Sequence, residues 1–236
     1  MQDSDFFCWW RESSLTFQSV AASADLQRVL QHQSMLMGFD YFSFCLRHPI
    51  PFTRPNLMAL TTNYPEPWLA AYQMEDITAC DLVLKEQPGS RYFSSWEAIT
   101  PLSNSAQSPV LHQGYTQGVI APNRTVGYLS VSNHVARPVT MPEEELMLRM
   151  LHICELSMMA LRRIDSPAFE AREMRLSKRE CEILQWTAEG KTSSEIAMIL
   201  AISENTVNFH QKNMQKRFNA PNKTQIACYA AATGLI

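Results

Sequence analysis

The segment from Leu176 to Ile236 decides the fold class of the C-terminal part of this chain: LSKRECEILQWTAEGKTSSEIAMILAISENTVNFHQKNMQKRFNAPNKTQIACYAAATGLI. Ser177 with Glu180, and Thr192 with Glu195, have the spacing of a capping box, in which hydroxyl and carboxylate satisfy backbone N–H groups at a helix start. Two further N-cap residues and two glycines that suit left-handed helix ends complete the pattern: Ser203, Asn222, Gly190 and Gly234. The segment is therefore predicted to be all-helical.

Two short breaks, at Glu189–Lys191 and near Ala201–Ser203, separate short helices at the spacing of a helix-turn-helix. The second helix of that pair, from Glu204 to Arg217, is polar and carries Asn, Gln and Lys on one face. Such a face is typical of a helix that reads DNA bases. A last helix is expected from Lys223 to Gly234.

The upstream sequence predicts a second domain of mixed structure. Strands are expected at 39–48, 58–63 and 125–133, which are rich in aromatic and β-branched residues. Helices are expected at Phe17–Met37, Pro67–Glu75 and Pro142–Ile164, the last with an apolar stripe that suits either core packing or a dimer seam. Helices on both sides of a small, mostly antiparallel sheet make an α/β/α sandwich, so the whole chain is classed as α+β.

The domain boundary is expected in the polar segment Asp165–Arg175, DSPAFEAREMR, which contains a proline and lacks a sustained apolar stripe. The predicted organisation is a ligand-sensing domain at residues 1–165, a linker at 166–175 and a DNA-binding domain at 176–236.

Composition and charge favour an ordinary soluble protein of 236 residues, with 46% hydrophobic and 18% charged residues and a net charge of -3. Residues 170–236 carry nine Lys/Arg and seven Asp/Glu, whereas the rest carries eleven and sixteen, so the C-terminal part is the one suited to approach phosphates. No signal peptide, anchor or membrane span is evident, and the six cysteines are scattered without metal-binding spacing. We expect a cytoplasmic protein without a metal, a cofactor or a membrane partner.

Between Asn63 and Trp96, aromatic residues with polar tips occur together with the acid Asp81: Tyr64, Trp68, Tyr72 and Trp96. Aromatic walls with a few hydrogen-bonding groups suit a pocket for an amphipathic ligand. The alternative is that the aromatic residues are core and Asp81 is a surface acid. Enzyme hypotheses find little support, because the GxSxG, P-loop, GxGxxG and HExxH motifs are missing.

The motif RECEILQWTAEGKTSSEIAMIL…ISENTVNFH…NKTQ resembles the DNA-binding domain of LuxR-type quorum-sensing regulators, with Glu180, Leu184 and Gly190 at hallmark positions. Further residues match the family's acyl-homoserine-lactone-binding signature: Trp68, Tyr72, Asp81, Trp96 and Gly114. RHPIPFTRP, TNYPEPW and APNRTVGYLS are most similar to the family's enterobacterial receptors that usually lack a partner lactone synthase.

This resemblance implies how a ligand would be held. Asp81 would accept the ligand's amide N–H, the Trp68 indole would donate to the lactone carbonyl, and the Tyr64 hydroxyl would donate to the acyl-amide carbonyl. Four residues would give supporting polar or packing contacts: Ser43, Ser130, Tyr72 and Trp96. Two departures bear on the pocket: Leu82 stands where the family commonly has proline, and the segment from Trp96 to Gly114, expected to form a helix over the pocket, is several residues shorter.

For DNA, the resemblance places the helix from Glu204 in the major groove, where Asn208 and Lys212 lie four residues apart and would contact base edges. The phosphate contacts expected are Lys191, Thr192, Asn205, Thr206, Lys216 and Arg217. The alternative for any one lysine is solvated surface. The last helix offers small residues to a two-fold partner, so a homodimer on a palindromic, lux-box-like site is expected.

Three hypotheses remain at this stage. In the first, a non-covalently bound acyl-homoserine lactone or similar amphiphile completes the N-terminal core and favours DNA binding. In the second, the regulator is independent of ligand or responds to another lipid. In the third, which is remote, the pocket belongs to an enzyme acting on a small amphiphile.

Overall fold

The computed structural model describes the chain except residues 1–2, 51, 53–55, 66–92, 97–110 and 165–174. The described residues divide into two compact units, one built on a sheet and long helices, the other mainly on four short helices. The predicted linker lies almost wholly outside the described residues, and its boundaries stay a prediction. No helix in the described ranges is long and apolar enough to cross a membrane.

The first unit is built on a five-stranded sheet in the order β2-β1-β5-β4-β3. Its strands are β1 (Tyr41–His48), β2 (Asn56–Thr62), β3 (Phe93–Trp96), β4 (His112–Ile120) and β5 (Val126–Asn133). The β1–β5, β5–β4 and β4–β3 pairs are antiparallel, as predicted for the sheet. β3 and β4 were not predicted.

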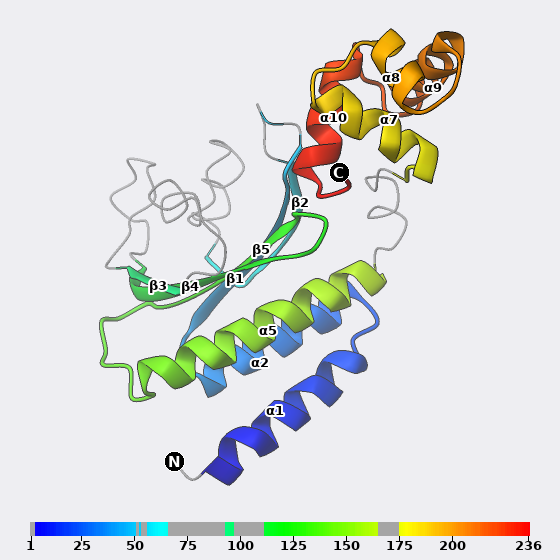
Figure 1. The fold of residues 1–236 in the computed structure, drawn as a ribbon. Helices are drawn as coiled ribbons and strands as arrows, with labels where there is room; N and C mark the ends of the chain where they lie inside the picture. Colours follow the sequence, from blue (N-terminus) through cyan, green and yellow to red (C-terminus); the bar gives the residue numbers. More distant parts are fainter. Residues whose placement is uncertain (1–2, 51, 53–55, 66–92, 97–110, 165–174) are drawn as a thin grey trace. The chain divides into compact units, whose positions relative to one another are not determined.

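Three helices pack on one side of this sheet: α1 (Asp3–Gln18), α2 (Ser23–Leu36) and α5 (Glu143–Ile164) (Figure 1). α5 contacts β4 and β5, while α1 and α2 pack against α5. The prediction of one helix over Phe17–Met37 was wrong, because the chain breaks between α1 and α2, where the Asp25 carboxylate accepts the backbone N–H groups of Ala21 and Ala22. The helix expected at Pro67–Glu75 lies outside the described residues.

The second unit contains α7 (Lys178–Ala188), α8 (Ser193–Ile199), α9 (Glu204–Arg217) and α10 (Lys223–Ala232). All four N-caps are the residues predicted, and both capping boxes form. Gly190 and Gly234 have φ of 79° and 71°, the left-handed region in which glycine has no Cβ penalty. The all-helical C-terminal domain is therefore confirmed, with α10 ending two residues earlier than expected.

Candidate functional site

The two faces of the sheet differ in chemistry. Because opposite residues of antiparallel strands point to the same side, one face carries Phe42, Phe44 and Leu46, which are buried on the helical side. A Cβ on Gly127, which is paired with Leu46, would lie 2.6 Å from Met158 Sδ of α5. The opposite face carries four buried hydroxyl residues in register across three strands: Ser43, Thr116, Ser130 and Ser132.

Trp96 lies directly on this hydroxyl face. It pairs with Gly114, and a Cβ built on Gly114 would stand only 2.1 Å from Trp96 Cζ2, so the indole occupies the space that any other residue at 114 would fill. Trp96 Nε1 donates to Thr116 Oγ1 at 3.1 Å, and Thr116 Oγ1 lies 2.8 Å from Ser130 Oγ. Two residues expected to touch the ligand, Trp96 and Ser130, are thus joined through Thr116.

Ser43 and Ser132 are completely buried on the same face. In the part of the chain that the structure describes, the hydroxyl of neither residue has a hydrogen-bond partner. A buried hydroxyl without a partner costs about 1–3 kcal/mol. A polar ligand atom on this face would remove that cost.

Tyr64 borders the hydroxyl face and is only 3% exposed. Its ring meets that of Tyr41 edge to face, with centroids 6.1 Å apart, and both rings belong to a small cluster with Leu111 and Trp96. Tyr64 N donates to Thr62 Oγ1 at 3.1 Å, which fixes the backbone just after β2 ends. The buried aromatic group and the hydroxyl row together line one face with apolar walls and a few polar atoms, as ligand sites require.

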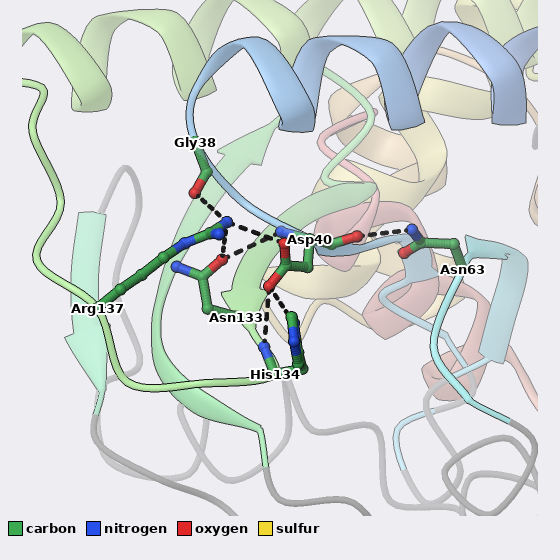
Figure 2. A network of polar contacts seen from close by, with 6 residues as sticks. All are labelled: Gly38, Asp40, Asn63, Asn133, His134 and Arg137. Atoms are coloured by element: carbon green, nitrogen blue, oxygen red, sulfur yellow. Dashed lines mark hydrogen bonds and ion pairs between the residues drawn. The ribbon is translucent and has the colours of Figure 1, made fainter.

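A polar network stands beside this cluster, at the end of the sheet where β1 begins (Figure 2). The Asp40 carboxylate accepts hydrogen bonds from the backbone N–H of His134, from the His134 ring and from Arg137 Nη2. Burial alone would raise the pKa of Asp40, but the hydrogen bonds from His134 and the charge of Arg137 outweigh it and hold the pKa below its ordinary value. The carboxylate therefore stays ionised in its cradle of donors.

The structure brings together four of the predicted ligand residues, Ser43, Tyr64, Trp96 and Ser130, on or beside one face. Trp68, Tyr72 and Asp81 lie outside the described residues, and so do Leu82 and the helix expected between Trp96 and Gly114. Sequence reasoning missed three residues of the face: Tyr41, Thr116 and Ser132. Thr116 could have been found if 112–120 had been recognised as a strand. Residues two apart in a strand point to the same face, and Gly114 was already a candidate residue.

In the second unit, the buried core joins all four helices through its apolar residues: Ile183, Leu184, Ile196, Ala197, Val207, Met214, Ala220, Ile226, Ala227 and Ala230. Gln211 is a polar exception, only 4% exposed. Its side chain accepts from Ser193 Oγ and donates to Thr187 Oγ1, each at 3.3 Å, and so bonds α9 to α8 and α7. This internal tie sets α9 on its neighbours while leaving its opposite face to solvent.

The predicted DNA contacts differ in exposure. Asn205, Lys212 and Lys216 are exposed on α9, whereas Lys191, Thr206 and Asn208 are half-buried. Arg217 is already engaged, since its Nη2 lies 3.0 Å from the buried Glu180 carboxylate and its guanidinium stacks over Phe218. The exposed Thr192 bonds through its hydroxyl to Glu195 in the capping box.

One exposed residue of α9 escaped sequence analysis. Phe209 is 61% exposed, one turn from both Asn205 and Lys212. Its position is visible in the sequence as a large apolar residue outside the buried set Val207, Gln211 and Met214. An apolar ring among polar residues on this face can contact a thymine methyl group.

Within the described ranges, no cluster of three His, Cys, Asp or Glu could hold a metal ion. The described cysteines form no disulfide.

Two family models match the chain. One, described as bacterial regulatory proteins of the luxR family, matches residues 174–230, and one, described as an autoinducer-binding domain, matches residues 22–164. The chain is 49% identical to the regulatory protein SdiA of Escherichia coli K12, with all of both chains covered. It is 41% identical to the quorum-sensing regulator RhlR of Pseudomonas aeruginosa, with 99% of each covered.

Solved structures agree with these matches. A crystal structure of Escherichia coli SdiA superposes with a TM-score of 0.82 at 48% identity, covering 98% of this chain and 99% of that one. SdiA in complex with octanoyl-rac-glycerol superposes with a TM-score of 0.80 at 48% identity, covering 100% and 98%.

Proposed function

This chain belongs to the LuxR family of bacterial regulatory proteins that carry an autoinducer-binding domain, and from that membership we propose that it responds to an acyl-homoserine lactone. The observation that carries the proposal is the hydroxyl face, where Trp96 lies on Gly114 beside buried serines that lack partners in the described structure. The likeness to SdiA extends the proposal to a receptor that works without a partner synthase.

In this account the lactone ligand lies against the hydroxyl face. Asp81 accepts its amide N–H, Trp68 donates to the lactone carbonyl and Tyr64 donates to the acyl-amide carbonyl. Tyr72 and Trp96 pack on the lactone and the root of the acyl chain, while Ser43 and Ser130 add polar contacts. The ligand binds non-covalently and no other cofactor is needed.

Binding of ligand to the folded state alone would stabilise the protein. At 100 times its Kd such a ligand adds about 2.7 kcal/mol, a large share of the stability of an ordinary domain. The stabilised protein then binds DNA as a homodimer on a palindromic, lux-box-like site, because a two-fold protein matches a two-fold site. This work is done in the cytoplasm, where the DNA is, and it involves no catalysis.

A second candidate ligand is a monoacylglycerol, since SdiA has been solved with octanoyl-rac-glycerol. The glycerol hydroxyls of such a ligand could pair with the buried serines of the hydroxyl face. Leu82 follows Asp81 where the family commonly has proline, and this departure is why both ligand classes are tested below.

Thermal melting of the full-length protein against acyl-homoserine lactones of graded chain length and 1-octanoyl-glycerol tests the proposal. We expect a dose-dependent rise in Tm with one or more lactones, blunted in Asp81→Asn and in Tyr64→Phe. A rise with the acylglycerol alone would favour the second candidate. If no lactone raises Tm while the protein still binds a palindromic duplex, the proposal of lactone sensing is wrong. A steady loss of intact lactone during incubation with the protein would indicate an enzyme instead.

A further inference from the structure

The position of Tyr64 depends on the residue before it. Asn63 follows the last residue of β2, and its side-chain amide bonds to β1 as another strand residue would. Asn63 Oδ1 accepts Phe42 N at 2.7 Å, and Asn63 Nδ2 donates to Asp40 O at 3.0 Å. The side-chain amide of Asn63 thus bonds to the backbone on both sides of Tyr41. Tyr64, the next residue, packs in the cluster with Tyr41, Leu111 and Trp96.

The part of β1 that Asn63 grips is itself held by the polar network of Figure 2. Asp40 N donates to Asn133 Oδ1 at 3.1 Å and to Ser132 O at 3.2 Å, so the backbone of Asp40 is bonded to the end of β5. The Asp40 carboxylate adds the bonds from His134 and Arg137 described above.

Arg137 draws a further segment into the same network. Its Nη2 lies 2.9 Å from Gly38 O, just after α2, and 2.8 Å from Asn133 Oδ1. Asp40 is therefore the point at which the end of α2, the start of β1, the end of β5 and the residue after β2 are tied together. Isolated exposed ion pairs contribute little to stability, but this carboxylate bonds to backbone and side-chain groups more than 90 residues away.

The network also reaches the ligand cluster through ring contacts. The Tyr41 ring lies edge to face on the Tyr64 ring. It also packs edge to face against the His134 ring, and the centroids of the Tyr41 and His134 rings are 6.3 Å apart. A shift of Asp40 would therefore displace Tyr41 and also disturb the hydrogen bonds between the Asn63 side chain and the backbone of β1. Both changes act on Tyr64.

We propose that Asp40 is a positioning residue for ligand recognition, which acts through Asn63 and Tyr41 to hold Tyr64 in place before the ligand arrives. The inference rests on the proposed function in one respect, the role of Tyr64 as a donor to the ligand. Asp40 itself does not touch the ligand. Its effect is a pre-organisation of the site, which lowers the cost of ordering a donor at the moment of binding.

A double-mutant cycle on the full-length protein tests this route of action. The dissociation constant of N-octanoyl-homoserine lactone is measured by titration calorimetry for the parent, Asp40→Asn, Tyr64→Phe and the double variant. We expect Asp40→Asn to weaken binding about tenfold when Tyr64 is present and less than about twofold in the Tyr64→Phe background. An equal loss in both backgrounds, or none in either, would overturn the proposal, since a merely structural role does not require the Tyr64 hydroxyl.

A measurement without ligand tests the positioning role of Asp40 independently of lactone binding. Amide hydrogen exchange of Phe42 and Tyr64, whose N–H groups bond to Asn63 and Thr62, should quicken about tenfold in Asp40→Asn. The matched control is Asp25→Asn, which removes a carboxylate that also accepts backbone N–H groups and pairs with an arginine, at the start of α2. It should leave both amides unchanged.

If no lactone binds the parent, lactone sensing fails while the exchange experiment still decides on positioning. Unchanged exchange in Asp40→Asn would then overturn the proposal. Should Asp40→Asn not fold, Arg137→Gln removes one donor to the carboxylate and is expected to quicken the same two amides.

Discussion

At the residue scale, Gly114 shows how one missing side chain shapes the hydroxyl face. The indole of Trp96 covers the position where a Cβ would stand, and its N–H then reaches Thr116. Gly114→Ala should displace the indole from the hydroxyl face, weaken ligand binding by about tenfold or more and lower Tm, because the new Cβ would overlap the rigid Trp96 ring, which must move away as a whole. Titration calorimetry and melting give the two readouts.

The matched control is Gly127→Ala on the opposite face. Its new Cβ would meet Met158 Sδ at 2.6 Å, so it should lower Tm while leaving ligand affinity within about twofold of the parent. Equal loss of affinity in the two variants would show that Trp96 has no special place in the site.

The buried carboxylate of Glu180 gives a second prediction at this scale, on the pH dependence of stability. Burial would raise the pKa of this carboxyl, but the bonds from Ser177 and Arg217 prevail and lower it. A lowered pKa in the folded state means that stability is present above the ordinary value of 4.5 and is lost as pH falls through and below it. Glu180→Gln should cost about 1–2 kcal/mol at neutral pH and flatten this acid dependence, measured by protection factors of α7 amides, which correct for the intrinsic pH dependence of exchange.

Glu195 offers a matched comparison for Glu180. It forms the same capping box with Thr192, but in the described structure no arginine bonds to its carboxylate, and it is more exposed. Glu195→Gln should therefore destabilise its helix less than Glu180→Gln destabilises α7. The reverse order would mean that the Arg217 bond contributes nothing.

At the element scale, the attachment of α1 should depend on pH. His152 of α5 is 5% exposed, stacks on Trp10 of α1 with centroids 3.6 Å apart, and lies 3.2 Å from Ser14 Oγ. Burial lowers its pKa and outweighs a backbone bond at Trp10 that raises it. One turn before His152 on the same helix, Arg149 is paired with Glu145.

A lowered histidine pKa means that the unfolded chain takes up the proton more readily than the folded one. Stability should therefore fall as pH drops below the ordinary value of 6.5. We expect the protection factors of α1 amides, which correct for the intrinsic pH dependence of exchange, to be lower at pH 5.5 than at pH 7.5. His152→Phe, which keeps a stacking ring, should remove most of that difference. A pH effect of the same size in the variant would contradict the assignment to His152.

The face of α9 carries the prediction for DNA. Lys212→Ala should relax discrimination between a palindromic site and a scrambled duplex, at a cost of about 1–3 kcal/mol on the cognate site. Lys216→Ala, as a phosphate contact, should weaken both duplexes alike and reduce the salt slope by about one. Fluorescence anisotropy over a range of salt separates the two effects, and a uniform loss in Lys212→Ala would remove it from the base contacts.

Elements whose signals are local could be predicted from sequence, and those defined by pairing could not. The four helices of the C-terminal unit begin at the residues expected because an N-cap and its partner lie within three positions of one another. β4 escaped because six consecutive residues, Gly114 to Val119, are buried on both faces, which erases the alternation that marks a strand. The break between α1 and α2 escaped because its two alanines carry no breaking signal.

The site shows the same division. Tyr64, Trp96 and the two serines could be named from the family resemblance, but Thr116 and Ser132 join the face only through register, which sets residues of distant segments side by side. The network around Asp40 is more remote still, since the partners of its carboxylate, His134 and Arg137, lie more than 90 residues away along the chain. No spacing in the sequence predicts such a contact.

At the scale of the whole molecule, the account joins two units through one free energy. If the ligand binds the DNA-competent state more tightly, it favours DNA binding, and DNA in turn raises the affinity for ligand by the same factor. This reciprocity belongs to the chain as a whole. It requires that the ligand bind the DNA-competent state with a different affinity from the state that does not bind DNA.

The most direct measurement is an anisotropy titration of a palindromic lux-box-like duplex with full-length protein, without ligand and with the lactone that gives the largest rise in Tm. The account predicts DNA binding at least about tenfold tighter with lactone, with two protein chains per duplex, and little gain in Asp81→Asn. Equal DNA affinity with and without saturating lactone would contradict it, because the ligand would then stabilise a fold whose regulatory function it does not control.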